Sequence, residues 1–211
     1  MITLYTWTMP NGRKISIALE EMGLPYEVKP INIGKDEQFS HDFLRIAPNN
    51  KIPAIVDHDA PGGPLSVFES GAILQYLAEK SGKFLPASGP GRYKVLEWLN
   101  WQMGGLGPML GQLNYFARRA PEQIPHAIGR FKDEGVRLMQ VMEKQLAKNA
   151  YLAGSEYSIA DMAAYGWTLG GLPGLKTLAG DALGPTPAVE LWLMTVGGRD
   201  AVKRGMAVPN V

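Results

Sequence analysis

The spacing of apolar positions in the first eighty residues predicts an alternation of strands and helices. Short apolar or alternating runs predict four strands, at residues 2–6, 26–29, 54–56 and 66–68. Apolar residues at three- and four-residue steps predict helices over 14–23 and 69–80, and a short helix around Phe43 and Leu44. The order β-α-β-α-β-β-α predicts a parallel pair with a right-handed crossover, followed by an antiparallel hairpin in the same mixed sheet.

The strand pattern stops after a segment rich in proline, glycine and serine at residues 86–91. From there, helical spacing predicts helices over residues 92–116, 124–150, 158–169 and 188–195. We therefore expect an α/β domain at residues 1–84, a linker at 85–91 and an all-α domain at 92–211.

Composition and charge exclude several classes of protein. The 211 residues are 45% hydrophobic and carry a formal net charge of +1, which argues against a broad surface for nucleic acid or anionic membrane. No apolar run reaches the roughly 18 residues of a membrane span, and no basic leader opens the chain, so we expect a cytoplasmic protein. The absence of cysteine excludes disulfides, thiolate-bound metals and a redox cysteine of the protein's own.

Neither a metal nor a nucleotide site stands out. The three histidines lack metal-ligand spacing, and the cluster Asp57-His58-Asp59 lies in a segment where aspartates are typical of turns. The glycine-rich run 104–111 lacks the strand and the lysine of a phosphate loop, and it predicts a kink at Pro108 with close helix packing instead. No Ser nucleophile motif is present. We expect no metal and no nucleotide cofactor.

Three features of the first domain carry candidate chemistry. Asn11 lies at the start of the first helix, Pro53 at the entry of a strand, and Glu69-Ser70 where the last strand passes into a helix. Taken singly, each has a plain structural explanation as a cap or a trans proline. Together, at one edge of the sheet, they would offer three contacts: a backbone free to pair with a peptide beside a cis proline, a helix N-terminus that binds an anion, and a carboxylate that binds an ammonium group. Such a set suits a zwitterionic peptide that carries a thiol.

At these residues the sequence resembles the glutathione transferase superfamily over essentially its whole length, most closely the bacterial Nu class and the fungal prion-type proteins. The resemblance lies in the segments 10–15, 48–55 and 67–77 and in the helix-capping sequence 158–161. It implies a thioredoxin-like N-terminal domain, a helical C-terminal domain and a homodimer.

The resemblance also implies how glutathione is bound. Ile52, before cis-Pro53, should pair through its backbone with the cysteinyl part, and Glu69 and Ser70 should bind the γ-glutamyl end. The remaining contacts that it implies come from Gln38, Lys51 and Arg130, although Lys132 and Arg137 share the predicted helix of Arg130. No metal or nucleotide enters this site, and the partner is a small electrophile or disulfide.

The residue that stabilises the thiolate is left open, because the family sequence Thr-Pro-Asn-Gly reads Thr8-Met9-Pro10-Asn11-Gly12 here. Asn11 and Thr8 are the candidates, with Tyr5 as runner-up inside its strand. The expected activity is disulfide reduction by glutathione, with peroxidase and conjugating activity beside it; the alternative is a non-catalytic glutathione-binding regulator. The acceptor pocket would draw on aromatic residues that equally fit a core or a dimer contact: Trp7, Tyr115, Phe116 and Trp167.

Overall fold

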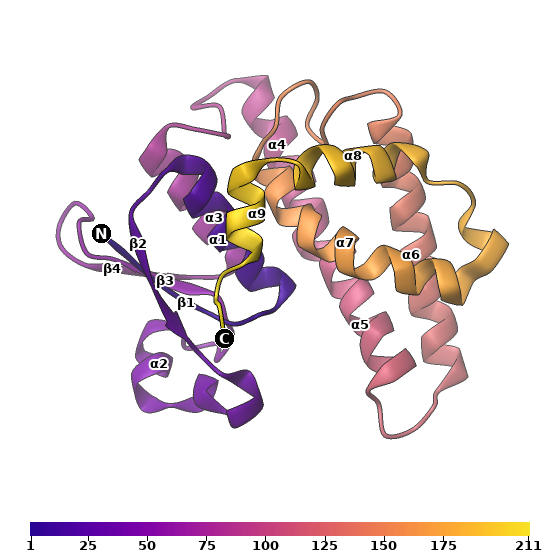
Figure 1. The fold of residues 1–211 in the computed structure, drawn as a ribbon, viewed down its shortest axis with the longest axis horizontal. Coiled ribbons are helices and arrows are strands. Elements are labelled where there is room, and N and C mark those ends of the chain that lie inside the picture. The colour runs from indigo at the N-terminus through magenta and orange to yellow at the C-terminus, as the bar shows by residue number, and fades with distance from the viewer. The chain divides into compact units, whose positions relative to one another are not determined.

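The computed structural model describes residues 1–211 and divides into two compact units, residues 1–87 with 197–211, and residues 88–196 (Figure 1). The first unit contains a sheet in the order β2-β1-β3-β4, made of β1 (Ile2–Thr6), β2 (Tyr26–Pro30), β3 (Ala54–Asp57) and β4 (Leu65–Phe68). Strand β1 pairs in parallel with β2, whereas the pairs β1–β3 and β3–β4 are antiparallel. The predicted mixed sheet and its closing hairpin are confirmed.

Helices cover both faces of this sheet. Figure 1 shows α1 (Pro10–Met22) and α3 (Ser70–Ser81) on one side and the short α2 (His41–Ile46) on the other. Two 3-10 turns, Ile33–Lys35 and Glu37–Phe39, lead into α2. Gly23 ends α1 in the left-handed conformation, φ 70°, as a glycine after the last helical turn does.

The C-terminal segment belongs to the first unit, and here the structure departs from the predicted boundary, which placed residues 197–211 in the helical domain. Helix α9 (Asp200–Met206) packs so closely on α1 that a Cβ on Gly205 would lie 2.5 Å from the Ile17 Cα. The Ser16 hydroxyl donates to the Gly205 carbonyl at 2.7 Å, and Arg199 forms a two-bond ion pair with Glu21. This seven-residue helix was missed because it is too short to show a periodic apolar pattern.

The second unit is all helical, as predicted. Its elements are α4 (Pro90–Trp101), α5 (Gly107–Arg118), α6 (Pro125–Leu146), α7 (Ile159–Ala179) and α8, which runs Pro187–Gly197. The single helix expected over 92–116 is interrupted by a π-helical turn at Gln102–Leu106. Pro108 has no N–H for the Gly104 carbonyl, and this missing hydrogen bond explains the interruption.

A buried carboxylate organises the start of α7. Ser158 and Asp161 form the predicted capping box. Asp161 is fully buried and also accepts hydrogen bonds from the Leu152 amide at 3.0 Å and the Trp192 indole at 2.9 Å. Burial raises the pKa of the Asp161 carboxyl, and these hydrogen bonds oppose that shift.

No helix of the structure has both the length and the apolar character to cross a membrane.

Replacing Gly205 with alanine tests the docking of α9 on α1. The added methyl group would overlap the backbone of Ile17, and we expect the free energy of unfolding to fall by about 2 kcal/mol or more. The control is Gly170→Ala in α7, where a Cβ meets open space and where alanine favours the helix. Equal unfolding midpoints in denaturant for Gly205→Ala and the wild type would contradict this packing.

Candidate functional site

The sheet register brings the candidate segments to one end of the sheet. Ala54, the first residue of β3, pairs with Tyr5 on one side and with Phe68 on the other. The residues just before β3, just after β1 and just after β4 therefore leave the sheet at the same end. The expected convergence of Ile52-Pro53 with Glu69-Ser70 is thus present in the fold.

The Ile52–Pro53 peptide bond is cis, as the resemblance implied. Pro53 is buried, and the Ile52 side chain packs on a small apolar cluster around Phe43 and Ala47. The sheet ladder begins only at Ala54, so the amide and carbonyl of Ile52 take no part in it. They remain available to an extended ligand.

Glu69 and Ser70 form the start of α3 with a strained backbone. Glu69 has φ 70° and ψ 114°, a conformation that costs a residue other than glycine of the order of 1–3 kcal/mol. Its side chain is exposed, does not cap the helix, and accepts a hydrogen bond from the Asn49 amide at 3.3 Å. The first turn of α3 therefore carries no side-chain cap, and a carboxylate outside it stays accessible to a ligand's ammonium group.

The turn from β1 into α1 differs in detail from the expectation. The N-cap residue of α1 is Met9, which has no capping side chain, and Asn11 lies inside the first turn. An ordinary N-cap role for Asn11 is therefore excluded. Thr8 is exposed in the bend before the helix. Gly12 is needed for a close approach, because a Cβ there would lie 2.3 Å from Thr6 Oγ1.

The three other candidates are Tyr5, Gln38 and Lys51. The Tyr5 ring packs at 6.2 Å from the Phe43 ring, within the cluster that also contacts Ile52. Gln38 donates to Asp36 at 3.3 Å, and its buried Oε1 has no partner. Lys51 is exposed at the same end of the sheet as Ile52 and makes no ion pair. Gln38 and Lys51 form no hydrogen bond or ion pair with Glu69 or Ser70.

Sequence reasoning missed one charged residue of this site, Lys14. Its side chain is 1% exposed, and its ammonium donates to Ser70 Oγ at 3.3 Å. Burial lowers the pKa of Lys14 to about 7, and the nearby Glu69 carboxylate acts in the opposite direction. A signal was present in the sequence, because Lys14 lies one helical turn before Ala18, on the apolar face that predicted α1.

The second unit contains a cavity of about 850 Å³ between α5 and α6, which includes Arg130 in its lining. Arg130 has no hydrogen-bond partner, whereas its two neighbours on α6 are paired, Lys132 with Asp133 and Arg137 with Glu134. Arg130 is therefore the one of these three cations that forms no hydrogen bond or ion pair within the protein.

Aromatic residues of the expected acceptor pocket have different surroundings. Phe116 stacks on Phe131, a cavity residue, with ring centroids 5.5 Å apart, and the Tyr115 ring meets Phe116 edge-on. Trp167 packs against α5, where a Cβ on Gly111 would lie 3.2 Å from its ring. Trp7 lies in the first unit. Trp167 therefore has a packing role, and Phe116 and Tyr115 adjoin the cavity.

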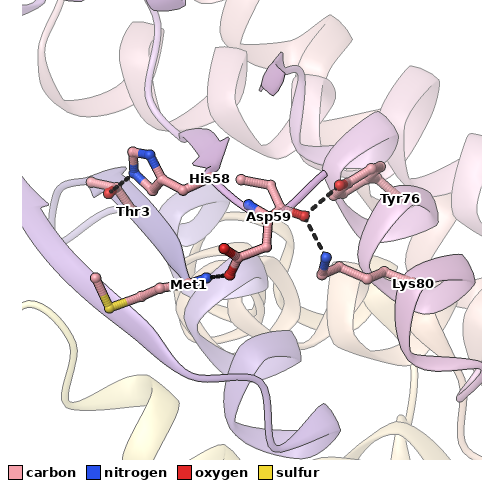
Figure 2. Close-up of polar contacts among 7 residues, drawn as sticks. Met1, Thr3, His58, Asp59, Tyr76 and Lys80 are labelled. Carbon is pink, nitrogen blue, oxygen red and sulfur yellow. Dashed lines mark hydrogen bonds and ion pairs between the residues drawn. The ribbon is translucent and has the colours of Figure 1, made fainter. Parts of the chain in front are cut away.

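The cluster Asp57-His58-Asp59 lies at the opposite end of the sheet. The Tyr76 hydroxyl and the Lys80 ammonium of α3 reach the same oxygen of Asp57. Figure 2 shows these two side chains, with the Met1 amino group paired with Asp59 and Thr3 paired with His58. Burial raises the pKa of Asp57, but these hydrogen bonds outweigh it and hold the pKa below its ordinary value. No three His, Asp or Glu side chains anywhere gather closely enough for a metal ion. This cluster is structural.

A four-stranded mixed sheet with a cis proline at one end, joined to an all-helical unit, defines a two-domain protein with a thioredoxin-like first domain. Sequence comparison names the class. Residues 1–79 match the N-terminal domain of glutathione S-transferases and residues 132–200 match their C-terminal domain. The chain belongs to the glutathione S-transferase family.

Relatives at full length support this assignment. The disulfide-bond oxidoreductase YfcG of Escherichia coli is 48% identical over 98% of this chain and 94% of its own, and YghU of the same organism is 43% identical over 98% and 74%. A glutathione transferase family member from Pseudomonas fluorescens, solved with two glutathione molecules bound, superposes with a TM-score of 0.92 at 41% identity, over 99% of this chain and 93% of its own. A transferase from Pseudomonas putida, solved with one glutathione disulfide per subunit, has the same score and identity over 99% and 91%.

Proposed function

We propose that this protein is a glutathione-dependent disulfide oxidoreductase that also conjugates glutathione to small electrophiles. The observation that carries the proposal is the meeting of Ile52-Pro53, Glu69-Ser70 and the start of α1 at one end of the sheet. In this arrangement the backbone of Ile52 pairs with the cysteinyl part of glutathione, and Glu69 holds the ligand's ammonium group. The first turn of α3, with Ser70, binds the adjacent carboxylate.

The sulfur then lies near the start of α1, where its negative charge is stabilised. A free thiol of pKa near 8.5 is only a few per cent ionised at pH 7. Lowering that pKa by two units requires about 2.7 kcal/mol of preferential stabilisation of the thiolate. The N-terminus of a thirteen-residue helix and one hydrogen bond from Asn11 or Thr8 together reach this size. Gln38 and Lys51 are proposed contacts of the remaining peptide.

The reaction consumes two glutathione molecules. The bound thiolate attacks one sulfur of a disulfide, forms a mixed disulfide and expels the other sulfur as a thiolate, which takes up a proton. Because the chain has no cysteine, a second glutathione thiolate must attack the mixed disulfide, giving glutathione disulfide and the second thiol. The relatives crystallised with two glutathione molecules or with glutathione disulfide accord with this stoichiometry. Reduced glutathione is a cytosolic redox buffer, so we place the protein in the cytoplasm, where cell fractionation should find it.

The test of function is the steady-state reduction of a small disulfide by glutathione. We expect turnover by the wild type and a roughly tenfold loss of kcat/KM in Asn11→Ala, the equivalent of one hydrogen bond to the thiolate. A smaller loss is expected for the exposed Thr8→Ala. Tyr5→Phe tests the runner-up, because it removes the hydroxyl while the phenylalanine ring keeps its packing on Phe43, and we expect its kinetics to match those of the wild type.

Three variants with wild-type kinetics would show that the thiolate is stabilised elsewhere. Faster conjugation of a haloarene without disulfide turnover would make conjugation the principal activity. Binding of glutathione with neither reaction would establish the non-catalytic regulator that Met9, in place of the family's threonine, keeps open.

Arg130 is the proposed glutathione contact from the helical unit, because it is the unpaired cation on the cavity between α5 and α6. We expect Arg130→Ala to raise the KM for glutathione about tenfold, as loss of one charge-assisted hydrogen bond does. Lys132→Ala, on the same helix but paired with Asp133, should leave KM unchanged. A KM unchanged by Arg130→Ala would remove this residue from the site.

We also propose a homodimer. Strand β4 is an edge of the sheet, and its side chains Leu65 and Phe68 are 42% and 37% exposed. Burial of such an edge against another copy removes apolar surface from water. Light scattering should give the mass of two 23.0 kDa chains, and Leu65→Asp should shift the mass towards one chain. A wild type with the mass of one chain at micromolar concentration would refute the dimer.

A further inference from the structure

Asn49 joins two segments of the proposed site through a side-chain hydrogen bond. Its amide Nδ2 donates to Oε1 of Glu69 at 3.3 Å, across a separation of 20 residues in the chain. Asn49 comes shortly before Ile52, and Glu69 immediately precedes the first turn of α3. The bond therefore connects the segment that would pair with the cysteinyl part of the ligand to the carboxylate that would hold its ammonium group.

A tight turn fixes the backbone of Asn49 relative to the core. The Asn50 amide donates to the Ala47 carbonyl at 2.9 Å, which closes a turn with Pro48 and Asn49 at its centre. Proline favours the second position of such a turn because its φ is already set. Ala47 is fully buried in the apolar cluster against which Ile52 packs. The position of Asn49 is thus tied to that of Ile52, and backbone atoms rather than the Asn49 side chain close the turn.

Glu69 has a fixed backbone, but only one hydrogen bond orients its side chain. The exposed carboxylate accepts that bond from Asn49. The buried Lys14 ammonium acts on the same carboxylate through its charge, an attraction that depends on distance and not on the orientation of the carboxylate. A glutamate side chain that rotates freely loses rotamer entropy when a ligand fixes it. A hydrogen bond that is made before the ligand arrives removes part of this cost from binding.

We propose that Asn49 is a positioning residue for the γ-glutamyl end of glutathione: it holds the Glu69 carboxylate so that its second oxygen meets the ligand's ammonium group. The Asn49 amide donates to Oε1, and both oxygens of a carboxylate accept hydrogen bonds, so Oε2 serves the ligand. An ammonium has three donors and no acceptor, and its hydrogen bond to a carboxylate is charge-assisted. This inference rests on the proposed function and assigns a further residue to its binding site.

Binding of two ligands, measured by calorimetry at about pH 6.5, separates this role from a structural one. The first ligand is S-methylglutathione, which has no thiol to ionise, and the second is the same molecule with its α-amine replaced by hydrogen. At this pH the amine of the first ligand is protonated, since the ordinary pKa of an α-amino group is near 8. We expect Asn49→Ala to bind S-methylglutathione roughly threefold to tenfold more weakly than the wild type, the size of one hydrogen bond. The deamino ligand should bind both proteins equally, because it has no ammonium group for Glu69.

Three further variants complete the test. Asn100→Ala is the matched control: this exposed asparagine bonds only to the Leu96 carbonyl of its own helix, so the variant should bind both ligands as the wild type does. Glu69→Ala should lose most of the preference for the ligand with the amine. Adding Asn49→Ala to Glu69→Ala should change little, because the asparagine acts through the glutamate. Asn49 is exposed, so the unfolding temperature of Asn49→Ala should equal that of the wild type.

The outcomes are distinct. An Asn49→Ala protein that binds both ligands as the wild type does would overturn the role of Asn49 alone. Equal weakening of both ligands would also overturn it, since the side chain would then support the turn and not the carboxylate. A wild type that binds the two ligands equally would remove Glu69, and Asn49 with it, from ammonium recognition. A wild type that binds neither ligand would overturn the proposed function itself.

Discussion

The site depends on one constraint, the register of the four-stranded sheet. Because β1 runs antiparallel to β3, the end of β1 and the start of β3 lie at the same end, and the hairpin returns β4 to that end as well. Three segments separated by tens of residues in the chain are thereby held by backbone hydrogen bonds. A one-residue slip of β3 would move Ile52 away from Glu69 and also turn the buried side chains of β3 outward. Core and site are specified by the same pairing.

The carboxylates at the two ends of the sheet have opposite surroundings. At one end the buried carboxylate of Asp57 is fully compensated by Lys80 and Tyr76. At the other end, the Glu69 carboxylate is exposed, and the backbone conformation of Glu69 costs stability. An exposed carboxylate on a strained backbone is typical of a site that is completed by a ligand. The contrast within one sheet supports a binding role for the second end.

Much of the fold could be predicted because long periodic segments depend on local spacing. The four-stranded mixed sheet, with its parallel pair and closing hairpin, and the long helix α6 followed from it. Where the structure departs from the prediction, the element is held by tertiary contacts or is too short to show a periodic apolar pattern. Helix α9 is held by contact of Gly205 with the backbone of Ile17, which no local pattern encodes. For the site, the segments were predictable from motif and resemblance. Lys14 was not predictable in this way, because the apolar spacing that predicts α1 does not show that a lysine on the same face is buried.

The missing cysteine restricts the chemistry more than any residue present. Every sulfur that reacts must arrive with a ligand, so the chain contributes charge, hydrogen bonds and geometry but no electrons of its own. The rate acceleration then depends on how firmly the first glutathione is held, since a loosely bound thiolate reacts as it would in water. The peptide's charged end lies furthest from the sulfur and supplies binding energy without touching the reaction. Firm binding of that end therefore sets the position of the thiolate at the other end of the ligand.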